Sequence, residues 1–543
     1  MATTSFDQRP SHLSRGQACF SCRRRKMKCD GVHPICGQCK RARRDEDCEY
    51  THGQKRARVE MLQESISQVE SRIYQLEHPH LNHQPGLALH QPYQGGSASR
   101  SASPRPINTA SWIAAEEPPN DVVQKLVDLF LSYSSEFGFF LNSSRFRQSA
   151  LLRQPIGHQA RPTPALLWAV YLCGLRLSKQ PQLIAQEPMF LSRALATVAN
   201  GLSVVHPQKV MHNLQAEILL AYYFFASGRF LEGKYHAASA VSLGLSSNLH
   251  MIRSAKAPPS VVPPPQDAIE EGERIHACWV VMILDKAWAV VLSENPHLDH
   301  QQQNLVVDTP WPLEMDNYQQ GRLSRTALYS NTLHKFINGV PTSDTGMSTT
   351  AMLSKASVLW QRADGLARDW KPDMPRDPSS AFHNSFAALD GLVDNFRAAL
   401  IPPNRIPHPT PIMTRALVVA HSIAHTATIK LQSIPPLRAE PRARQKRLGA
   451  ATAVLNIIVS IPLQHFAFIN PVMGTVWLAS CQILLEEIYT LRTQRSSNWQ
   501  GEEETGLVSL LTRTLGVLSS FTGTCPLLNY QISRIQEACA GMQ

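Results

Sequence analysis

Six cysteines lie close together near the start of the chain, and their spacing is typical of metal ligands. The pattern is Cys19-x2-Cys22-x6-Cys29-x6-Cys36-x2-Cys39-x8-Cys48. It contains one C-x2-C-then-C unit twice, which predicts two pseudo-equivalent halves. A single tetrahedral zinc takes four ligands and two separate zincs take eight, so six thiolates serve two zinc ions only if two of them bridge. The alternative is one four-cysteine zinc site, with two cysteines that bind no metal.

The segment around these cysteines is strongly basic. Residues 15–58 hold thirteen Lys and Arg against five Asp and Glu, a net +8 of the whole chain's +11. Two zinc ions and six thiolates carry a formal charge of about −2, so the cluster partly compensates the surrounding Arg and Lys. Such a local surplus favours a polyanionic partner. A module of this size buries little apolar surface, so we expect the metals to supply its folding free energy, about 10 kcal/mol or more.

This stretch resembles the fungal binuclear zinc cluster, the DNA-binding module of fungal transcription regulators, and we place that domain at residues 15–50. The resemblance implies two Zn²⁺ ions. It gives the cysteines three roles: two bridging ligands (Cys19 and Cys36), two that complete one site (Cys22 and Cys29) and two that complete the other (Cys39 and Cys48).

The residues between Cys22 and Cys29 are good helix formers without Gly or Pro, which predicts a helix between these two ligands. In the family, the carboxyl end of this helix enters the major groove of double-stranded DNA and reads a G/C-rich, CGG-like triplet. By position, Arg25 and Lys26 match the base-reading pair, where the family often has two lysines, and Lys28 matches a phosphate contact. The other basic residues are expected at phosphates or on a solvated basic face: Arg23, Arg24, Lys40, Arg41, Arg43 and Arg44. Basic clusters of this size also predict nuclear import.

A heptad pattern follows the basic linker at residues 51–58. Over residues 59–77 the apolar positions recur at intervals of three and four: Val59, Leu62, Ile66, Val69, Ile73 and Leu76. Every a position is β-branched and two of the three d positions are Leu, which favours a parallel coiled coil and hence a homodimer with two DNA half-sites. The alternative is an amphipathic helix docked on its own chain. Residues 78–120, rich in Pro, Gly, Ser, Gln and His, predict a disordered linker.

Residues 121–543 show helical periodicity with proline-rich interruptions and no alternating strand pattern, which predicts a large all-α domain. Two apolar stripes flank Gly228 and predict an antiparallel helical hairpin. The first stripe is Leu214, Ile218, Tyr222 and Phe225, and the second is Leu231, Tyr235, Ala238, Val241 and Leu245. With the apolar segment before Asp285, this hairpin resembles the helical regulatory region of the same regulators. The resemblance implies a regulatory domain open to co-regulators or a small-molecule effector.

The sequence contains only weak indications of a catalytic site. Asp285 and Lys286 interrupt an apolar helix, and we expect a satisfied structural pair there, although buried charges also mark catalytic sites. Asp344-Thr345-Gly346 matches the aspartic-protease tripeptide but lacks a second copy and flanking strands. The sequence has no phosphate-binding glycine loop, nucleophile elbow or zinc-protease motif. We therefore expect no enzyme. The five other cysteines are expected to be buried thiols: Cys173, Cys278, Cys481, Cys525 and Cys539.

The longest strongly apolar stretch, residues 279–284, is too short to cross a bilayer, so no membrane partner is expected. The leading hypothesis is a zinc-dependent, sequence-specific factor that regulates RNA polymerase II transcription in a fungal nucleus. A second hypothesis is a helical enzyme or scaffold whose zinc module contacts proteins. A third is a general chromatin binder that uses charge alone.

Overall fold

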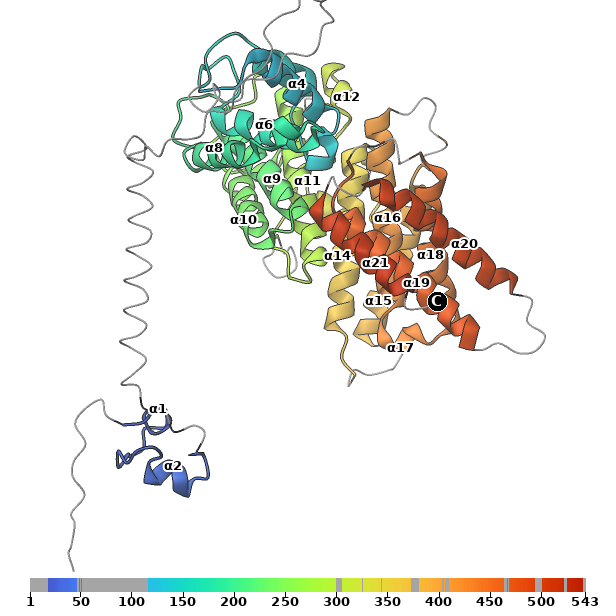
Figure 1. Cartoon of the computed structure of the whole chain (residues 1–543). Coiled ribbons are helices and arrows are strands. Elements are labelled where there is room, and N and C mark those ends of the chain that lie inside the picture. The colour runs from blue at the N-terminus through green and yellow to red at the C-terminus, as the bar shows by residue number, and fades with distance from the viewer. Residues whose placement is uncertain are drawn as a thin grey trace, which may run out of the picture. The chain divides into compact units, whose positions relative to one another are not determined.

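The computed structural model describes residues 18–45, 48, 50, 116–298, 305–324, 326–342, 344–372, 380–402, 405, 410–462, 466, 468–493, 501–521 and 525–540. The chain divides into two compact units, residues 1–104 and 105–543 (Figure 1). The predicted coiled coil at 59–77 lies outside the described residues, as does the predicted linker up to residue 115.

Within its described residues, the small unit contains two short helices, α1 (Phe20–Arg24) and α2 (Gly37–Arg41), which contact each other. Its buried core consists of the six cysteines, against which Ala18, Ile35 and Tyr50 pack. Because a core of thiols offers so little apolar area, side-chain burial alone stabilises this unit weakly.

The large unit is all-α, as predicted. Its described residues contain no strand, only an isolated bridge between Ser254 and Tyr329. The longer helices of the first part are α4 (Asn120–Leu131), α5 (Ser143–Ala150), α6 (Pro164–Leu177), α8 (Glu187–Ala199), α9 (Lys209–Ala226), α10 (Phe230–Ser246) and α11 (Ala268–Val291). Those of the second part are α14 (Thr349–Asp369), α15 (Ala381–Ala399), α16 (Pro411–Gln432), α18 (Pro441–Ser460), α19 (Met473–Thr493), α20 (Glu502–Leu518) and α21 (Pro526–Ala540). The short helices between them are α7 (Pro181–Ile184), α12 (Met315–Gln319), α13 (Thr332–Ile337) and α17 (Pro435–Arg438).

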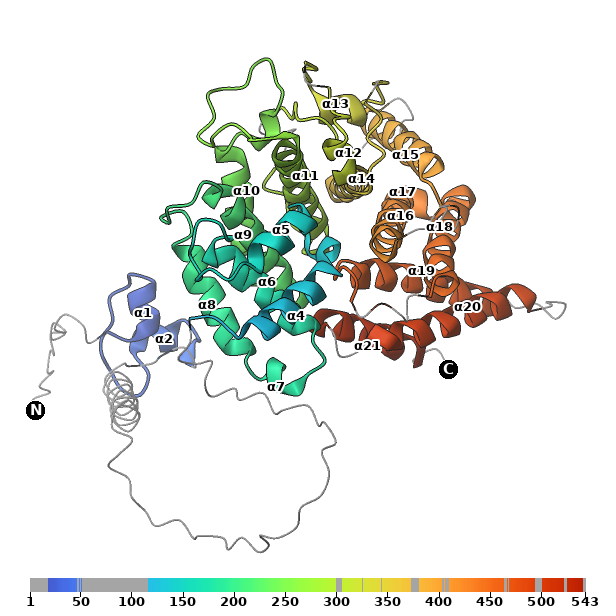
Figure 2. The ribbon, with the colours of Figure 1, turned by 90° about the horizontal axis from the view of Figure 1, so that it is seen from above.

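Helix α11 connects the two parts of the large unit. It packs against α9 and α10 and also against α14, which in turn packs against α16 (Figure 2). Asp267 caps its amino end by accepting bonds from the N–H groups of Ile269 and Glu270, both at 2.9 Å. Trp279 and nearly every other side chain from Gly272 to Val290 is buried. Residues 277–284 of α11 are apolar on all sides of the helix, which requires this segment to lie inside the domain.

The predicted hairpin is confirmed as α9 and α10, joined at Gly228 with φ +74°. The first stripe is buried as expected, but the second was wrong at Leu231 and Tyr235, which are 79% and 68% exposed. Val241 is buried as predicted, and the rest of the buried face of α10 consists of His236 and small residues: Gly233, Ala237, Ala240 and Gly244. At Gly233 an added Cβ would lie 2.4 Å from the Phe225 ring, so α10 approaches α9 too closely for a larger side chain.

Asp285 and Lys286 form a satisfied structural pair, as expected. The Asp285 carboxylate accepts bonds from the N–H groups of His297 (2.7 Å) and Leu298 (3.0 Å), and the Lys286 ammonium donates to the Leu298 carbonyl. The two buried charges therefore fasten the loop after α11 to that helix.

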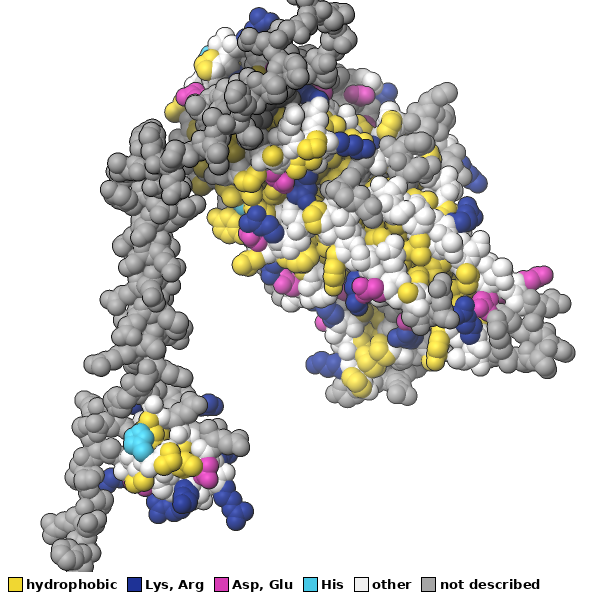
Figure 3. Space-filling model, viewed as in Figure 1, with side chains coloured by type: hydrophobic (Ala, Val, Ile, Leu, Met, Phe, Trp, Pro, Cys, Tyr) yellow, Lys and Arg dark blue, Asp and Glu magenta, His cyan; other side chains and the backbone are white. Residues whose placement is uncertain are grey.

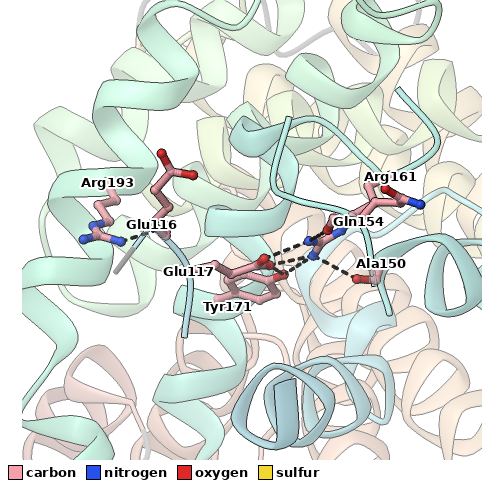
Figure 4. A network of polar contacts seen from close by, with 7 residues as sticks. All are labelled: Glu116, Glu117, Ala150, Gln154, Arg161, Tyr171 and Arg193. Atoms are coloured by element: carbon pink, nitrogen blue, oxygen red, sulfur yellow. Dashed lines mark hydrogen bonds and ion pairs between the residues drawn. The ribbon is translucent and has the colours of Figure 1, made fainter. Parts of the chain in front are cut away.

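A buried network anchors the beginning of the large unit (Figure 4). Arg161, 4% exposed, makes a bidentate ion pair with Glu117 at 2.6 and 2.7 Å, and the Tyr171 hydroxyl donates to the same carboxylate at 2.5 Å. Arg193 donates to the Glu116 carbonyl at 3.0 Å. Glu116 and Glu117 fall within the segment assigned to the linker, yet they contact the helical unit.

Candidate metal centre and nucleic-acid interface

The six cysteines come together as the spacing implied. Neighbouring sulfurs lie 3.7 Å apart for Cys19 and Cys36, 3.7 Å for Cys22 and Cys36, and 3.8 Å for Cys19 and Cys39. A tetrahedral zinc with Zn–S bonds of about 2.3 Å has sulfurs about 3.8 Å apart, so these distances fit zinc. The thiols therefore suit metal ligation, and they form no disulfide.

Cys36 is the central member of the cluster. The sulfur of Cys36 groups with those of Cys19, Cys22 and Cys39, and also with Cys29. Cys48 also lies beside Cys36, since its sulfur accepts a hydrogen bond from the Cys36 N–H at 3.2 Å. A bridging ligand must reach both metal sites, and this central position is where such a ligand has to lie.

Electrostatics favour a thiolate at Cys36. Burial raises the pKa of this thiol, but hydrogen bonds from Cys39 and the neighbouring thiols outweigh burial and lower the pKa to about 6. The nearest backbone donor is the N–H of Cys39, at 3.4 Å. A deprotonated sulfur at neutral pH is the form that binds zinc.

The two halves of the module repeat each other in three dimensions. Cys19 is the N-cap of α1 and its sulfur accepts from the Cys22 N–H at 3.4 Å, while Cys36 caps α2 and accepts from Cys39 at 3.4 Å. The first ligand of each C-x2-C pair thus begins a helix that carries the second ligand.

The two helices also end alike. In α1 the N–H of Met27 bonds to the Cys22 carbonyl and that of Lys26 to the Arg23 carbonyl, which is a Schellman motif. The N–H groups of Arg44 and Arg43 make the same bonds at the end of α2. Lys26 and Arg43 both take left-handed conformations, with φ +54° and +49°. These two residues are therefore equivalent in the pseudo-twofold.

Helix α1 is shorter than the predicted helix between Cys22 and Cys29. It begins at Phe20 and ends at Arg24, so Lys26 and Lys28 follow the helix. The left-handed turn at Lys26 stops the helix and redirects the chain so that Cys29 reaches the cluster. The prediction was wrong because helix propensity was weighed without this metal-imposed reversal.

All nine predicted DNA-contacting side chains are exposed: Arg23, Arg24, Arg25, Lys26, Lys28, Lys40, Arg41, Arg43 and Arg44. Lys and Arg side chains gather along the lower edge of the small unit in Figure 3. Met27, 47% exposed, adds an apolar group beside Lys26. Since the cluster is buried and the cations are outside, the module presents charge without presenting its metal ligands.

Sequence reasoning missed two supporting residues, Asp30 and Tyr50. The Asp30 carboxylate accepts two bonds from the Gly37 N–H, at 2.9 and 3.0 Å, and so ties the loop of one half to the start of α2. The Tyr50 hydroxyl donates to the Val32 carbonyl at 3.0 Å, and its ring lies 3.8 Å from that of His33. The available signals were an acid directly after Cys29 and a glycine directly after Cys36.

The remaining cysteines behave as expected. Four are fully buried in the large unit and Cys539 is partly buried. Burial raises the pKa of the Cys173, Cys278 and Cys481 thiols to about 12, which makes them unreactive.

Comparison with known families agrees with this geometry. Residues 17–57 match the fungal Zn(2)-Cys(6) binuclear cluster domain, and residues 127–326, from α4 to the segment after α12, match the fungal specific transcription factor domain. The chain carries both domains of a fungal zinc-cluster transcription factor. The six cysteines of the matched cluster domain imply two zinc ions with bridging thiolates.

The chain is also similar to the notoamide biosynthesis cluster transcriptional coactivator notQ' of Aspergillus versicolor. The two chains are 23% identical over 330 residues, which cover 56% of this chain and 59% of the relative. This chain therefore spans less than two thirds of the relative's length. Within the described residues, none of the helices combines the length and apolarity needed to cross a bilayer.

Proposed function

We propose that this fungal transcription factor is a zinc-dependent, sequence-specific reader of G/C-rich, CGG-like triplets that regulates RNA polymerase II transcription in the nucleus. The observation that carries the proposal is a buried cluster of thiols at zinc-ligand spacing, surrounded by nine exposed cations. The double domain match and the relative described as a transcriptional coactivator support it.

The proposed metal roles follow the central position of the Cys36 sulfur and the equivalent N-cap position of Cys19. Cys19 and Cys36 bridge the ions, Cys22 and Cys29 complete one site, and the other two cysteines complete the second (Cys39 and Cys48). When bound, the zinc ions fix the two helix starts and with them the directions of the basic side chains.

The proposed DNA contacts divide into two classes. Arg25 and Lys26, at the carboxyl end of α1, contact guanine acceptors in the major groove, where each good base contact discriminates by about 1–3 kcal/mol. Lys28 and the remaining exposed cations contact phosphates, which sets position and affinity but not sequence.

Two copies are proposed to act together through residues 59–77, so that a binding site contains two triplets. The helical unit is proposed as the regulatory part, where co-regulators or a small-molecule effector act. No catalytic activity is proposed. A helical enzyme or scaffold with a protein-binding zinc module would need neither Arg25 nor Lys26 for its activity.

The pseudo-twofold provides a matched test. Zinc-loaded full-length protein is used to select from a random DNA pool, beside Lys26→Gly and Arg43→Gly variants. Both substitutions remove one cation from equivalent left-handed positions, and glycine keeps that backbone conformation accessible. We expect paired G/C-rich triplets with the unchanged protein and with Arg43→Gly, and loss of the preference with Lys26→Gly.

Three outcomes would contradict the proposal. Equal loss of preference in both variants would assign the selectivity to charge rather than to the end of α1. A flat pool from the unchanged, zinc-loaded protein would support the scaffold hypothesis. Binding without preference that weakens about 10³-fold or more between 50 and 200 mM salt would instead indicate a general chromatin binder.

A further inference from the structure

A cavity of about 380 Å³ lies in the large unit among the loop after α13, helix α14 and helix α15. Its volume falls within the range of small-molecule sites, roughly 300–1,000 Å³. Apart from Trp311, its lining residues follow the matched transcription factor domain at 127–326. Neither matched domain therefore accounts for it.

The walls of the cavity are mainly apolar and aromatic. Trp311, Phe336 and Phe396 contribute rings, and Met347 and Met352 contribute thioethers, which adapt to ligand shape. Met347 is 43% exposed, so this side of the cavity reaches the surface. Aromatic walls with an opening to solvent suit a flat, apolar molecule that enters edge first.

One buried cation faces this apolar space. Lys355 is 7% exposed, and its ammonium donates to the carbonyls of Thr345 (2.5 Å) and Gly346 (3.0 Å). The same nitrogen lies 4.6 Å from the ring centroid of Trp311 and 5.4 Å from that of Phe336. An ammonium has three N–H groups, and among the described residues the two carbonyls accept from two of them, which leaves the third for an acceptor on a ligand.

Asp344 balances the charge of this wall. Its carboxylate accepts bonds from the N–H groups of Trp311 (3.0 Å) and Gly346 (3.3 Å), so the loop is held against the ring. The Asp-Thr-Gly tripeptide thus has a structural role: it holds Trp311 and the two carbonyls that position Lys355. With one acid and one cation lining the cavity, an additional anion would meet the Asp344 carboxylate, so an uncharged ligand fits better.

We propose that this cavity binds an uncharged, planar and largely apolar small molecule whose carbonyl oxygen accepts a hydrogen bond from Lys355. That such a ligand regulates transcription rests on the function proposed above, whereas its binding does not.

The test uses equilibrium dialysis of the zinc-loaded full-length protein, without DNA, against three probes of similar shape. 2-Acetylnaphthalene carries the carbonyl, 2-ethylnaphthalene lacks it, and 2-naphthoate carries a charge. We expect saturable binding of 2-acetylnaphthalene, with the other two probes bound about tenfold more weakly, the effect of one hydrogen bond. Failure of all three probes to bind, or tightest binding of 2-naphthoate, would overturn the proposal.

Two substitutions on α15 locate the site. Ala399 lines the cavity and is exposed, so Ala399→Trp fills the space without disturbing the core; Ala388→Trp, exposed on the same helix away from the cavity, is the matched control. Binding must be lost in the first variant and kept in the second. Lys355→Met must remove the preference for 2-acetylnaphthalene over 2-ethylnaphthalene. Binding that survives Ala399→Trp would overturn the proposal, whatever the outcome of the DNA selection.

Discussion

The small and large units bury different kinds of side chain. The buried core of the small unit consists of six cysteines. The large unit has tryptophans among its largest fully buried side chains: Trp279, Trp288, Trp360 and Trp477. Apolar burial contributes about 25 cal/mol per Å², so the large unit is stabilised by area that the small unit lacks. From this difference we expect the small unit to need metal for its fold and the large unit to fold without it.

Removal of zinc should produce the largest difference in stability between the two units. We expect a chelator, or Cys36→Ala, to unfold the small unit, since the metals contribute about 10 kcal/mol or more, and to leave the large unit folded. Hydrogen exchange of the full chain, read at residues 18–45 and at α11, measures both units at once. Cys525→Ala, which removes a buried thiol of the large unit, should leave residues 18–45 protected. Persistent protection of that segment without zinc would refute metal dependence.

The second effect concerns charge buried in the large unit. Arg415 and Glu136 pair at 3.3 Å with both side chains 2% exposed, so Arg415→Met leaves a buried carboxylate unpaired. We expect a loss of about 3–5 kcal/mol in the free energy of unfolding. All nine tryptophans lie in the large unit, and their fluorescence during urea unfolding reports on it alone. The control Arg438→Met, which breaks an exposed pair with Glu486, should cost about 1 kcal/mol or less. Equal losses would show that burial of the pair is unimportant.

The third effect tests the close contact between α9 and α10. Gly233→Ala places a methyl group against the Phe225 ring, and we expect it to destabilise the large unit by about 1–3 kcal/mol. Gly449→Ala, on the exposed side of α18 with open space around it, should stabilise by up to about 1 kcal/mol. The same urea experiment measures both variants, and effects of equal sign would contradict the packing described here.

The smallest expected effect is at an exposed position of the α9–α10 hairpin, which can be compared with a buried position of the same hairpin. Leu231→Gln changes an exposed side chain of α10, so we expect a change within about 0.5 kcal/mol. Leu214→Ala empties a fully buried position of α9 and should cost about 2–5 kcal/mol. A large effect at Leu231 would mean that this face of α10 is covered.

Features that depend on the spacing of residues along the chain could be predicted from the sequence. Features that depend on how closely two elements approach each other could not. Cys19 to Cys48 were found because ligands of one cluster recur at short, fixed intervals. The end of α1 was missed because Lys26 looks like a helix former, and only the need to bring Cys29 back to the cluster explains its left-handed turn.

The helical unit gives the same lesson. The apolar stripe of α9 was predicted correctly, since large residues mark a buried face. On α10 the large residues Leu231 and Tyr235 are exposed, and much of the buried face is glycine and alanine. The role of Gly233 is visible only in the structure, where the Phe225 ring packs against it. The cavity beside Lys355 is lined by residues spread from Trp311 to Leu400, so no local sequence pattern predicts it.

The buried pair of Glu117 and Arg161 bears on how the helical unit should be produced in isolation. An expression fragment that starts at residue 121, the boundary suggested by periodicity, would lack Glu117 and leave the Arg161 guanidinium buried without its carboxylate. A start ahead of Glu116 retains that carboxylate and the carbonyl that accepts from Arg193. We therefore expect the longer fragment, rather than the shorter one, to give soluble protein that crystallises.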